Sequence, residues 1–437
     1  MDARRFVVAL LVIAGAALAL RVGYVVTVTQ DETVAYDGFY YQSEAETVGR
    51  GKGFVTPFGG DENADHPPLT VLTLAPVARV TDGSELAMRL TVALAGVGVV
   101  VLIGLLGREV AGPRVGLVAA GTAALYPNLW MNDGLLMAET FAALTVAGTL
   151  LATVLLVRTP SWRHGLGAGV GCGLAMLARG ELALLIPFVV LPAVVLLRDS
   201  SRQARLRLAG VTVGAALLVV SPWVAYNLSR FEEPVFLSNG DGGVLLGANC
   251  DDVYYGDGIG YWSITCAVAV PMKGRDRSEV SDAQREKAFD YIGDHLGRLP
   301  IVVLARLGRT WSLYAPGQSA DLGVGEGRPH GLSLIGAALF WLLVPFAFFG
   351  VRRLRGDPAL VPLLGPFVLV FVVAAVFYGA VRFRVPAEVP LVVLAAVGVD
   401  RLLVRSGNRG EDQRRRYPEQ PEPGPERPGA AGAESGK

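Results

Sequence analysis

Carboxylates, arginines and other polar residues stand at the ends of long apolar runs in this sequence. Asp37 follows the first run, in the segment Tyr36-Asp37-Gly38-Phe39-Tyr40-Tyr41. The polar residues at the ends of later runs are Glu139, Arg179, Glu181, Tyr226, Asn227, Arg382 and Arg384. A carboxylate can exchange a proton with a substrate, and a guanidinium can bind an anion through paired hydrogen bonds. Whether these side chains lie close together depends on the helices and loops that carry them.

The composition indicates which elements those are. The chain has 437 residues, of which 52% are hydrophobic, with a mean hydropathy of +0.45 and a formal net charge of +0. A membrane absorbs this much apolar surface, whereas an ordinary soluble domain does not carry it. The neutral charge balance gives no indication of a nucleic-acid partner. We therefore interpret the chain as an all-α integral membrane protein.

About ten apolar runs have lengths near the roughly 20 residues that a helix needs to cross about 30 Å of hydrocarbon. We expect spans near residues 6–28, 86–106, 115–131, 135–157, 165–178, 181–197, 208–226, 331–350, 359–380 and 386–404. The fifth and sixth are short and meet at Ala178-Arg179-Gly180-Glu181. They are expected to form a hairpin of tilted or partly spanning helices.

Basic residues predict the orientation, because Lys and Arg in short loops stay on the cytoplasmic side. With the N-terminus inside, the inner loops carry arginines at 108 and 114, 158 and 163, 198 to 207, and 352 to 355. Residues 1–404 then form one polytopic domain with two long extracytoplasmic loops, 29–85 and 227–330. The Pro-, Glu- and Gly-rich segment 405–437 is expected to be a disordered cytoplasmic tail. A cleaved signal peptide at the first run is the alternative, which would place the N-terminus outside.

The second long loop contains Cys250 and Cys266. The oxidising exterior permits a disulfide between them, whereas Cys172 lies in the fifth span and is interpreted as a packing residue. The same loop predicts an amphipathic helix at 281–295. It also predicts an interfacial helix at 300–314 with two arginines, 306 and 309, on its polar side.

This topology brings the polar residues to the extracytoplasmic face, but each also has a structural interpretation. A charged side chain near a helix end can reach the membrane interface at little cost. We favour that interpretation for Arg21, Asp31 and Glu32. For the Arg179 and Glu181 pair, and for the two arginines at 382 and 384, an ion pair at the membrane edge and a functional role both stay open.

A functional interpretation is favoured for Asp37, which lies among tyrosines and precedes glycines at 49, 51 and 53. The same order of motifs continues along the chain. The motifs are Asp37-x-x-x-Tyr41-x-x-x-Ala45, Gly49-x-Gly51-x-Gly53-Phe54, His66-Pro67-Pro68-Leu69, Ala138-Glu139-Thr140, Arg179-Gly180-Glu181, Pro222-Trp223-x-x-Tyr226-Asn227-x-x-Arg230-Phe231 and Arg382-Phe383-Arg384-Val385-Pro386.

In its order and spacing this series resembles the polytopic glycosyltransferases of the GT-C superfamily, over most of residues 1 to 404. The similarity is to the family 39-like group, which includes protein O-mannosyltransferases and lipid A aminoarabinose transferases. The Arg-Gly-Glu motif resembles the family's Arg-Pro-Glu. One departure lies in the first loop, where the family often has Asp-Glu but Gly38 follows Asp37. The pair Asp31-Glu32 lies upstream, so Asp31 stays the alternative to Asp37.

The resemblance implies inverting transfer of a sugar from a polyprenyl-phosphate-linked donor to an acceptor hydroxyl at the extracytoplasmic membrane face. Asp37 would be the general base that takes the proton of that hydroxyl. Basic side chains would hold the donor phosphate and stabilise its growing charge. These are Arg179, Arg382 and Arg384, with Lys52 and His66 as weaker candidates. The supporting residues would be Tyr41, Glu139, Glu181, Tyr226 and Asn227.

Two other classes of protein stay open. A secondary transporter would show internal repeats and ionisable residues near the bilayer midplane, and neither is evident. A non-catalytic scaffold or lipid flippase would share the architecture. No cofactor or metal site is assigned, because Asp61, Glu62, Asp65 and His66 lack the spacing of a known ligand set. The sequence identifies neither the sugar nor the acceptor, which is a glycan, a protein or a lipid.

Overall fold

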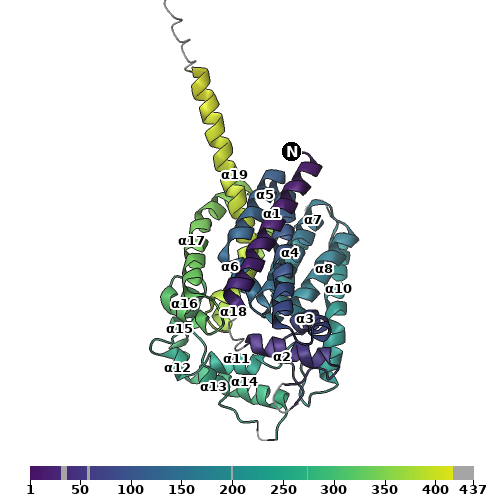
Figure 1. The fold of residues 1–437 in the computed structure, drawn as a ribbon, viewed down its shortest axis with the longest axis vertical. Helices are drawn as coiled ribbons and strands as arrows, with labels where there is room; N and C mark the ends of the chain where they lie inside the picture. Colours follow the sequence, from purple (N-terminus) through teal and green to yellow (C-terminus); the bar gives the residue numbers. More distant parts are fainter. Residues whose placement is uncertain (31–36, 57–59, 198–199, 273, 417–437) are drawn as a thin grey trace, which may run out of the picture.

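The computed structural model describes residues 1–416 except 31–36, 57–59, 198–199 and 273, with side chains to residue 402. Long helices form a bundle, and shorter helices form a layer across the end of the bundle opposite the N-terminus (Figure 1). The described residues contain no strand, and one isolated antiparallel bridge pairs Val55 with Glu62. The all-α prediction is confirmed.

The bundle helices follow the predicted spans. They are α1 (Ala3–Tyr24) continued by the π-helical turn η1 (Val25–Thr29), α4 (Glu85–Ala111), α5 (Pro113–Leu125), α7 (Glu139–Arg158), α8 (Trp162–Ala178), α10 (Arg202–Leu228), α17 (His330–Arg353), α18 (Leu360–Val376) and α19 (Val385–Arg416). Between α8 and α10 the chain forms the short pieces η3 (Gly180–Leu184), η4 (Ile186–Val190) and α9 (Leu191–Val195). The predicted hairpin is therefore present, with a broken second half.

Five of these helical segments are long and apolar enough to cross a membrane by length and composition. They are Ala3–Thr29, Glu85–Ala111, Glu139–Arg158, Arg202–Leu228 and His330–Arg353. The remaining bundle helices are shorter or, like α19, buried among the others for much of their length.

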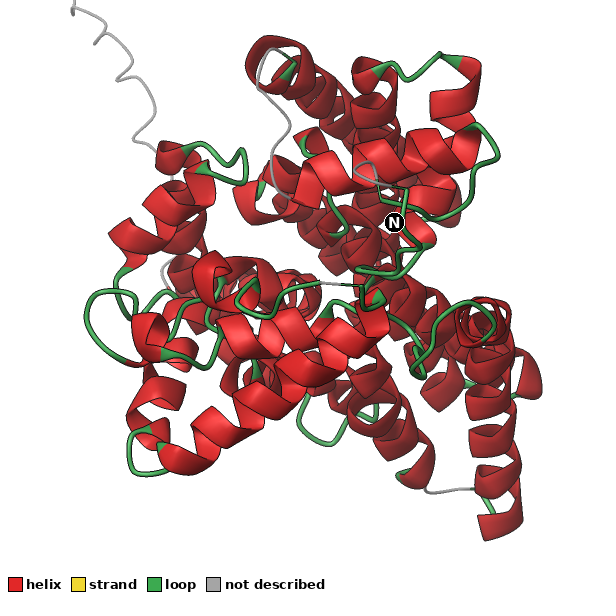
Figure 2. Cartoon of the chain, turned by 90° about the horizontal axis from the view of Figure 1, so that it is seen from below, coloured by secondary structure: helices red, strands yellow, loops and turns green. Residues whose placement is uncertain are grey.

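The layer is built from the two long loops. Figure 2 shows the molecule from below, with this end of the bundle toward the viewer. The first loop contributes α2 (Asp37–Gly49) and α3 (Leu69–Val80). The second contributes α11 (Asp241–Gly247), α12 (Asp251–Tyr254), α13 (Ile264–Ala267), α14 (Arg277–Asp294), α15 (Leu299–Thr310) and α16 (Pro316–Val324). Short turns of helix, α6 (Pro127–Trp130), η2 (Met131–Gly134) and η5 (Val381–Arg384), join bundle helices. Both long loops thus lie at the same end of the bundle.

Glycines allow the bundle helices to approach closely. A Cβ added to Gly350 on α17 would collide with the backbone carbonyl oxygen of Leu394 on α19, and one added to Gly398 would collide with that of Phe346. On α8, Gly169 meets the backbone of Thr212 on α10 in the same way. Such small-residue contacts replace the hydrophobic effect, which is weak between helices in lipid.

Two helices of the second loop differ from their predictions. α14 begins at Arg277 rather than 281, because Asp276 caps it and forms a capping box with Glu279. The helix predicted at 300–314 is α15, but its arginines do not lie on an exposed polar side. Arg306 and Arg309 are 1% and 0% exposed.

The buried arginines of α15 satisfy backbone carbonyl groups instead. Arg306 donates to the carbonyl oxygens of Ala248 and Ala375, and Arg309 donates to that of Ile259. These carbonyl groups lie in loops or at the end of α18, where helical partners are missing. The two arginines therefore join the layer to the bundle, and the predicted polar side of this helix is buried against backbone carbonyl groups.

The C-terminal segment also departs from expectation. α19 continues to Arg416, so residues 405–416 of the segment expected to be disordered are helical. Residues 417–437 of that expected tail, like Asp31 and Glu32, lie outside the described residues.

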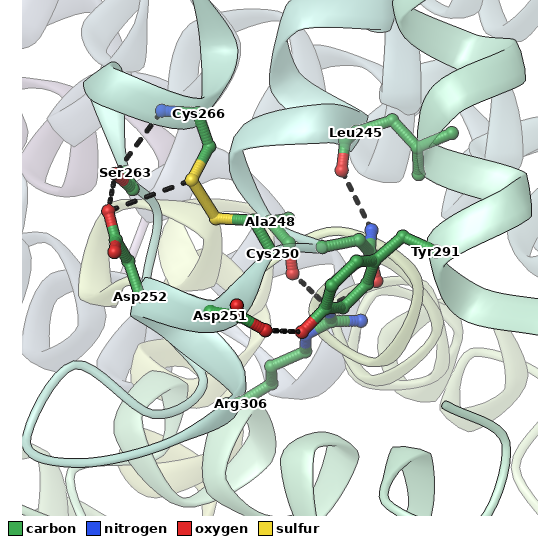
Figure 3. Close-up of a disulfide and its surroundings, with 10 residues drawn as sticks. Leu245, Ala248, Cys250, Asp251, Asp252, Ser263, Cys266, Tyr291 and Arg306 are labelled. Atoms are coloured by element: carbon green, nitrogen blue, oxygen red, sulfur yellow. Dashed lines mark hydrogen bonds between the residues drawn. A yellow bond between two sulfur atoms is a disulfide. The ribbon is translucent and has the colours of Figure 1, made fainter. Parts of the chain in front are cut away.

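A disulfide joins Cys250 and Cys266 (Figure 3), which confirms the predicted pair. It closes a loop of 16 residues that contains α12. Next to it, the carboxylate of Asp252 accepts a hydrogen bond from the hydroxyl of Ser263, and the hydroxyl of Tyr291 on α14 donates to Asp251. The disulfide and these bonds hold the outer part of the layer to α14.

The orientation of this layer in the membrane is testable by thiol labelling. We predict that a cysteine at the exposed position of Lys287 on α14 reacts with a membrane-impermeant maleimide in intact cells. A cysteine at the exposed position of Arg355, between α17 and α18, should react only after the cells are opened. The native cysteines give low background, because Cys172 is buried and the other two are joined. The opposite labelling pattern would invert the proposed topology.

Candidate active site

A cavity of about 840 Å³ lies between the layer and the bundle. Its walls come from α2, from the loop before α3, from the start of α7, from η3, from residues 234–244 and from the region between α18 and α19. Six segments that are distant in the sequence thus contribute to one space. The ionisable residues that line it are Asp37, Asp65, His66, Glu139, Arg179, Glu181, Asp241, Arg285 and Arg382.

The contact at the centre of the cavity joins α2 near the start of the chain to η5, which lies between α18 and α19. Nη1 of Arg382 lies 2.6 Å from Oδ2 of Asp37, 345 residues away in the sequence. Nη2 of Arg382 donates to the hydroxyl of Tyr378 at 2.7 Å. Burial opposes ionisation of Asp37, but the neighbouring Arg382 and His66 hold the pKa of its carboxyl group well below the usual range. Asp37 is therefore a carboxylate in this state.

His66 lies on the other side of Asp37. Its Nε2 atom is 3.8 Å from Oδ1 of Asp37. The ring of Tyr41 stacks on the imidazole with centroids 5.1 Å apart, and Tyr40 meets it edge to face at 4.8 Å. Burial favours the neutral ring, but the neighbouring carboxylate of Asp37 outweighs this effect and raises the pKa of His66. Asp37 thus faces a guanidinium on one side and an imidazole on the other.

Arg179 forms a second ion-paired group next to the first. Its Nε atom lies 2.6 Å from Glu181, and its Nη1 atom lies 3.0 Å from Glu139, which is 1% exposed. The guanidinium of Arg179 also lies over the ring of Phe383, 5.1 Å from its centroid. The structure thus brings the predicted residues at 37, 41, 66, 139, 179, 181 and 382 to one cavity.

Besides Asp241 and Arg285 of the lining, two further charged residues of this region were not predicted from the sequence. Glu326, in the turn between α16 and α17, lies 3.4 Å from Arg382, and Arg328 lies 3.6 Å from Glu139 and 3.7 Å from Glu326. Both follow glycines in the segment Gly323-Val324-Gly325-Glu326-Gly327-Arg328. A charged pair between glycines directly before a span was the signal available in the sequence.

Arg384 lies away from the cavity. It is 0% exposed, its Nε atom lies 2.6 Å from Glu388 on α19, and its guanidinium lies 3.8 Å from the centroid of Phe340. Glu388 also accepts a hydrogen bond from the hydroxyl of Tyr126 at 2.7 Å. The full burial and the ion pair with Glu388 favour a structural role for Arg384, unlike that of Arg382.

Three further predicted residues do not line the cavity. Lys52 is exposed in the loop after α2. Asn227 is buried and bonds to Arg230 through its side-chain oxygen, and the guanidinium of Arg230 lies 4.4 Å from the ring centroid of Tyr226. Arg230 in turn donates to the backbone of Phe54. The pair at 226 and 227 therefore fixes the first loop on α10.

The cavity has one apolar and one polar side. Ala183 and Leu184 of η3, and Val373 and Phe377 at the end of α18, form an apolar wall. The polar side carries residues held by arginines of α14. Asp65 accepts hydrogen bonds from Arg277, and Asp241 accepts them from Arg285 at 2.9 and 3.1 Å. A substrate with both a lipid part and a polar part matches this division.

The residues at 61, 62, 65 and 66, which were weighed as metal ligands, form no such group. Within the described ranges, one set of side chains has atoms close enough for a metal ion, namely Cys250, Asp252 and Cys266. Both of its sulfur atoms belong to the disulfide, so it offers no thiolate.

The chain was compared with known families and structures. A family model described as dolichyl-phosphate-mannose-protein mannosyltransferase matches residues 65–226. No curated protein sequence matches the chain. The matched segment contains the cavity residues at 65, 66, 139, 179 and 181.

Two solved structures share the fold at low identity. ArnT from Cupriavidus metallidurans bound to undecaprenyl phosphate has a TM-score of 0.58 and 18% identity, covering 93% of this chain and 62% of its own. The oligosaccharyltransferase AglB from Archaeoglobus fulgidus, in complex with an inhibitory peptide and a dolichol-phosphate, has a TM-score of 0.55 and 16% identity, covering 95% and 52%. The chain spans between half and two thirds of their lengths. Part of this chain thus matches the mannosyltransferase family model, and the fold of nearly the whole chain is similar to those of ArnT and AglB.

Proposed function

We propose that this chain transfers a sugar from a polyprenyl-phosphate-linked donor to an acceptor hydroxyl, with inversion at the anomeric carbon, at the extracytoplasmic membrane face. The observation that carries this proposal is the contact of Asp37 with Arg382 inside a cavity with one apolar and one polar side. A carboxylate and a guanidinium in contact supply a base for the acceptor and a ligand for the leaving phosphate. The phosphate-bearing lipids in the ArnT and AglB complexes support this class of donor.

The apolar wall formed by η3 and the end of α18 binds the lipid part of the donor. The polyprenyl chain lies against Leu184, Val373 and Phe377, where apolar contacts cost no desolvation of polar groups. The phosphate then lies at Arg382 and Arg179, and the sugar extends toward Asp37. The acceptor enters from the polar side, past Asp65 and Asp241. This arrangement places the acceptor hydroxyl and the leaving phosphate on opposite sides of the sugar, as a single inverting displacement requires.

The contact between base and arginine also connects donor binding to catalysis. Without a donor, Arg382 stabilises the carboxylate of Asp37 and makes it a weak base. A donor phosphate at Arg382 shares that positive charge, so the pKa of Asp37 rises toward that of an ordinary carboxylate. The base gains strength when a donor is present.

The first test replaces the base. We predict that Asp37→Asn lowers the rate of sugar transfer at least about 100-fold, because general bases typically contribute 10² to 10⁴. Donor affinity should not weaken, since the substitution frees Arg382. The assay is transfer from a polyprenyl-phosphate sugar by purified protein in nanodiscs, at matched folded concentration.

Two control variants make this test specific. Asp61→Asn, at an exposed carboxylate of the same loop, should transfer at nearly the wild-type rate. Near-normal transfer by Asp37→Asn with a collapse for Asp31→Asn would move the base to Asp31. A lipid flippase or scaffold would release no polyprenyl phosphate in any variant.

The second test separates the two arginines of η5. We predict that Arg382→Gln weakens binding of the donor at least about tenfold, because it removes a charge-assisted hydrogen bond to phosphate. Arg384→Gln should instead destabilise the protein by about 3 kcal/mol or more, because it leaves Glu388 buried and unpaired. Its affinity for donor, measured on folded protein, should be unchanged. Equal effects of the two variants on donor binding would contradict this division of roles.

A further inference from the structure

Among the residues that the structure describes, the charges around the cavity leave no surplus positive charge for a donor phosphate. A continuous set of ion pairs joins four carboxylates with three guanidiniums. The carboxylates are Asp37, Glu139, Glu181 and Glu326, and the guanidiniums are Arg179, Arg328 and Arg382. Even a protonated His66 only brings this set to neutrality. A phosphate adds a negative charge, and like charges in a partly buried site repel strongly. One carboxylate must therefore leave the guanidiniums when a donor binds.

Glu326 is the carboxylate held most weakly. Its contacts with Arg382 and Arg328 are 3.4 and 3.7 Å long, whereas the carboxylates at 37, 139 and 181 lie 2.6 to 3.0 Å from their arginines. Its side chain is 20% exposed, and Glu139 is buried. Asp37 must stay beside the acceptor to act as a base. The position and weak contacts of Glu326 make it the displaceable member of the set.

The backbone around Glu326 permits the movement. Glycines flank it at 325 and 327, and Gly327 has a φ of +85°, a conformation that other residues rarely adopt. The segment is a turn between α16 and α17. The carboxylate can swing away from the arginines without moving either helix.

Arg328 has unused hydrogen-bonding capacity at this place. Its side chain is 8% exposed, and within the described part of the chain its Nε and Nη2 atoms form no hydrogen bond. A guanidinium that is buried with unsatisfied donors carries an energetic cost, which an oxyanion relieves. Nε of Arg382 is unsatisfied as well. Two guanidiniums that both contact Glu326 thus keep free donors for the same anion.

We propose that Glu326 occupies the place of the donor phosphate in the donor-free protein, and that Arg328 binds this phosphate together with Arg382 after Glu326 is displaced. The inference rests on the proposed function, because it takes a polyprenyl phosphate as the ligand. It assigns a third phosphate-binding residue, in addition to Arg179 and Arg382, and an internal competitor for the site.

Two single variants test the proposal in opposite directions. The probe is undecaprenyl phosphate, titrated into protein in nanodiscs, with undecaprenol as the uncharged control lipid. Glu326→Gln removes the competitor and should tighten binding about three- to tenfold, as expected when a competing closed state is removed. Arg328→Gln should weaken binding at least about tenfold. Asp321→Asn, at an exposed carboxylate of α16, should change nothing.

A double variant separates displacement from a general change in charge. If Glu326 and the phosphate compete for Arg328, the gain from Glu326→Gln should fall below about twofold in the Arg328→Gln background. A gain that persists unchanged there would overturn the proposal, as would wild-type affinity in both single variants. Arg328→Lys, which keeps the charge, guards against misfolding: it should keep the thermal stability of the wild type and bind with intermediate affinity.

The same titration distinguishes this inference from the proposed function. If the wild-type protein binds undecaprenyl phosphate no better than undecaprenol, the donor class itself is wrong and both proposals fall. If the wild type prefers the phosphate but the variants at 326 and 328 do not respond, only the roles of these two residues fall.

Discussion

A guanidinium at the end of an apolar helix bundle must be neutralised, and the contact of Arg382 with Asp37 meets this requirement by joining the last spans to the first loop. An unpaired charge that is buried between the layer and the bundle would cost several kcal/mol, so arginines and carboxylates alternate around the cavity. The layer of short helices is held over the bundle by these pairs and by the buried arginines of α15. The same ion pairs therefore stabilise the fold and place in the cavity the guanidinium groups that can bind an anion.

Buried charges are also paired deeper in the bundle. Arg21 of α1 and Asp133 of η2 lie 2.6 Å apart, and each side chain is 1% exposed. The sequence favoured a simple interfacial position for Arg21, but the arginine is buried against a carboxylate of a neighbouring segment. Together with the pair of Arg384 and Glu388, this contact fixes which helices are neighbours, because a mismatched arrangement would leave a charge without a partner.

The spans and the shared end of the two loops were predictable, because bilayer thickness dictates helix length and basic residues dictate sidedness. The convergence of Asp37, His66, Glu139, Arg179 and Arg382 was predictable from the order of the motifs. The rotation of each helix about its own axis was not predictable from the sequence. Residues 382 and 384 lie two positions apart in η5, so one faces the cavity and the other faces α19. Sequence spacing gives the depth of a side chain but leaves its neighbours undetermined.

A second reason explains why some residues of the site and of the layer were not predicted correctly from the sequence. The roles of Glu326 and Arg328, like the burial of Arg306 and Arg309, depend on how the second loop folds back on the bundle. Contacts of this kind involve backbone carbonyl groups and distant carboxylates, which leave no periodic pattern along the chain. Hydropathy alone assigns such arginines to solvent.

The burial of α19 has a consequence for how the protein is made. Residues 385–398 of this helix are buried among α4, α5, α7, α17 and α18, and the close approach at Gly350 and Gly398 leaves no room for lipid between α17 and α19. Among the described bundle helices, the one at the centre of the packing is thus the last to leave the ribosome. The earlier helices therefore insert into the bilayer before their contacts with α19 exist. Insertion of α19 completes the packing of the bundle and the site at Arg382.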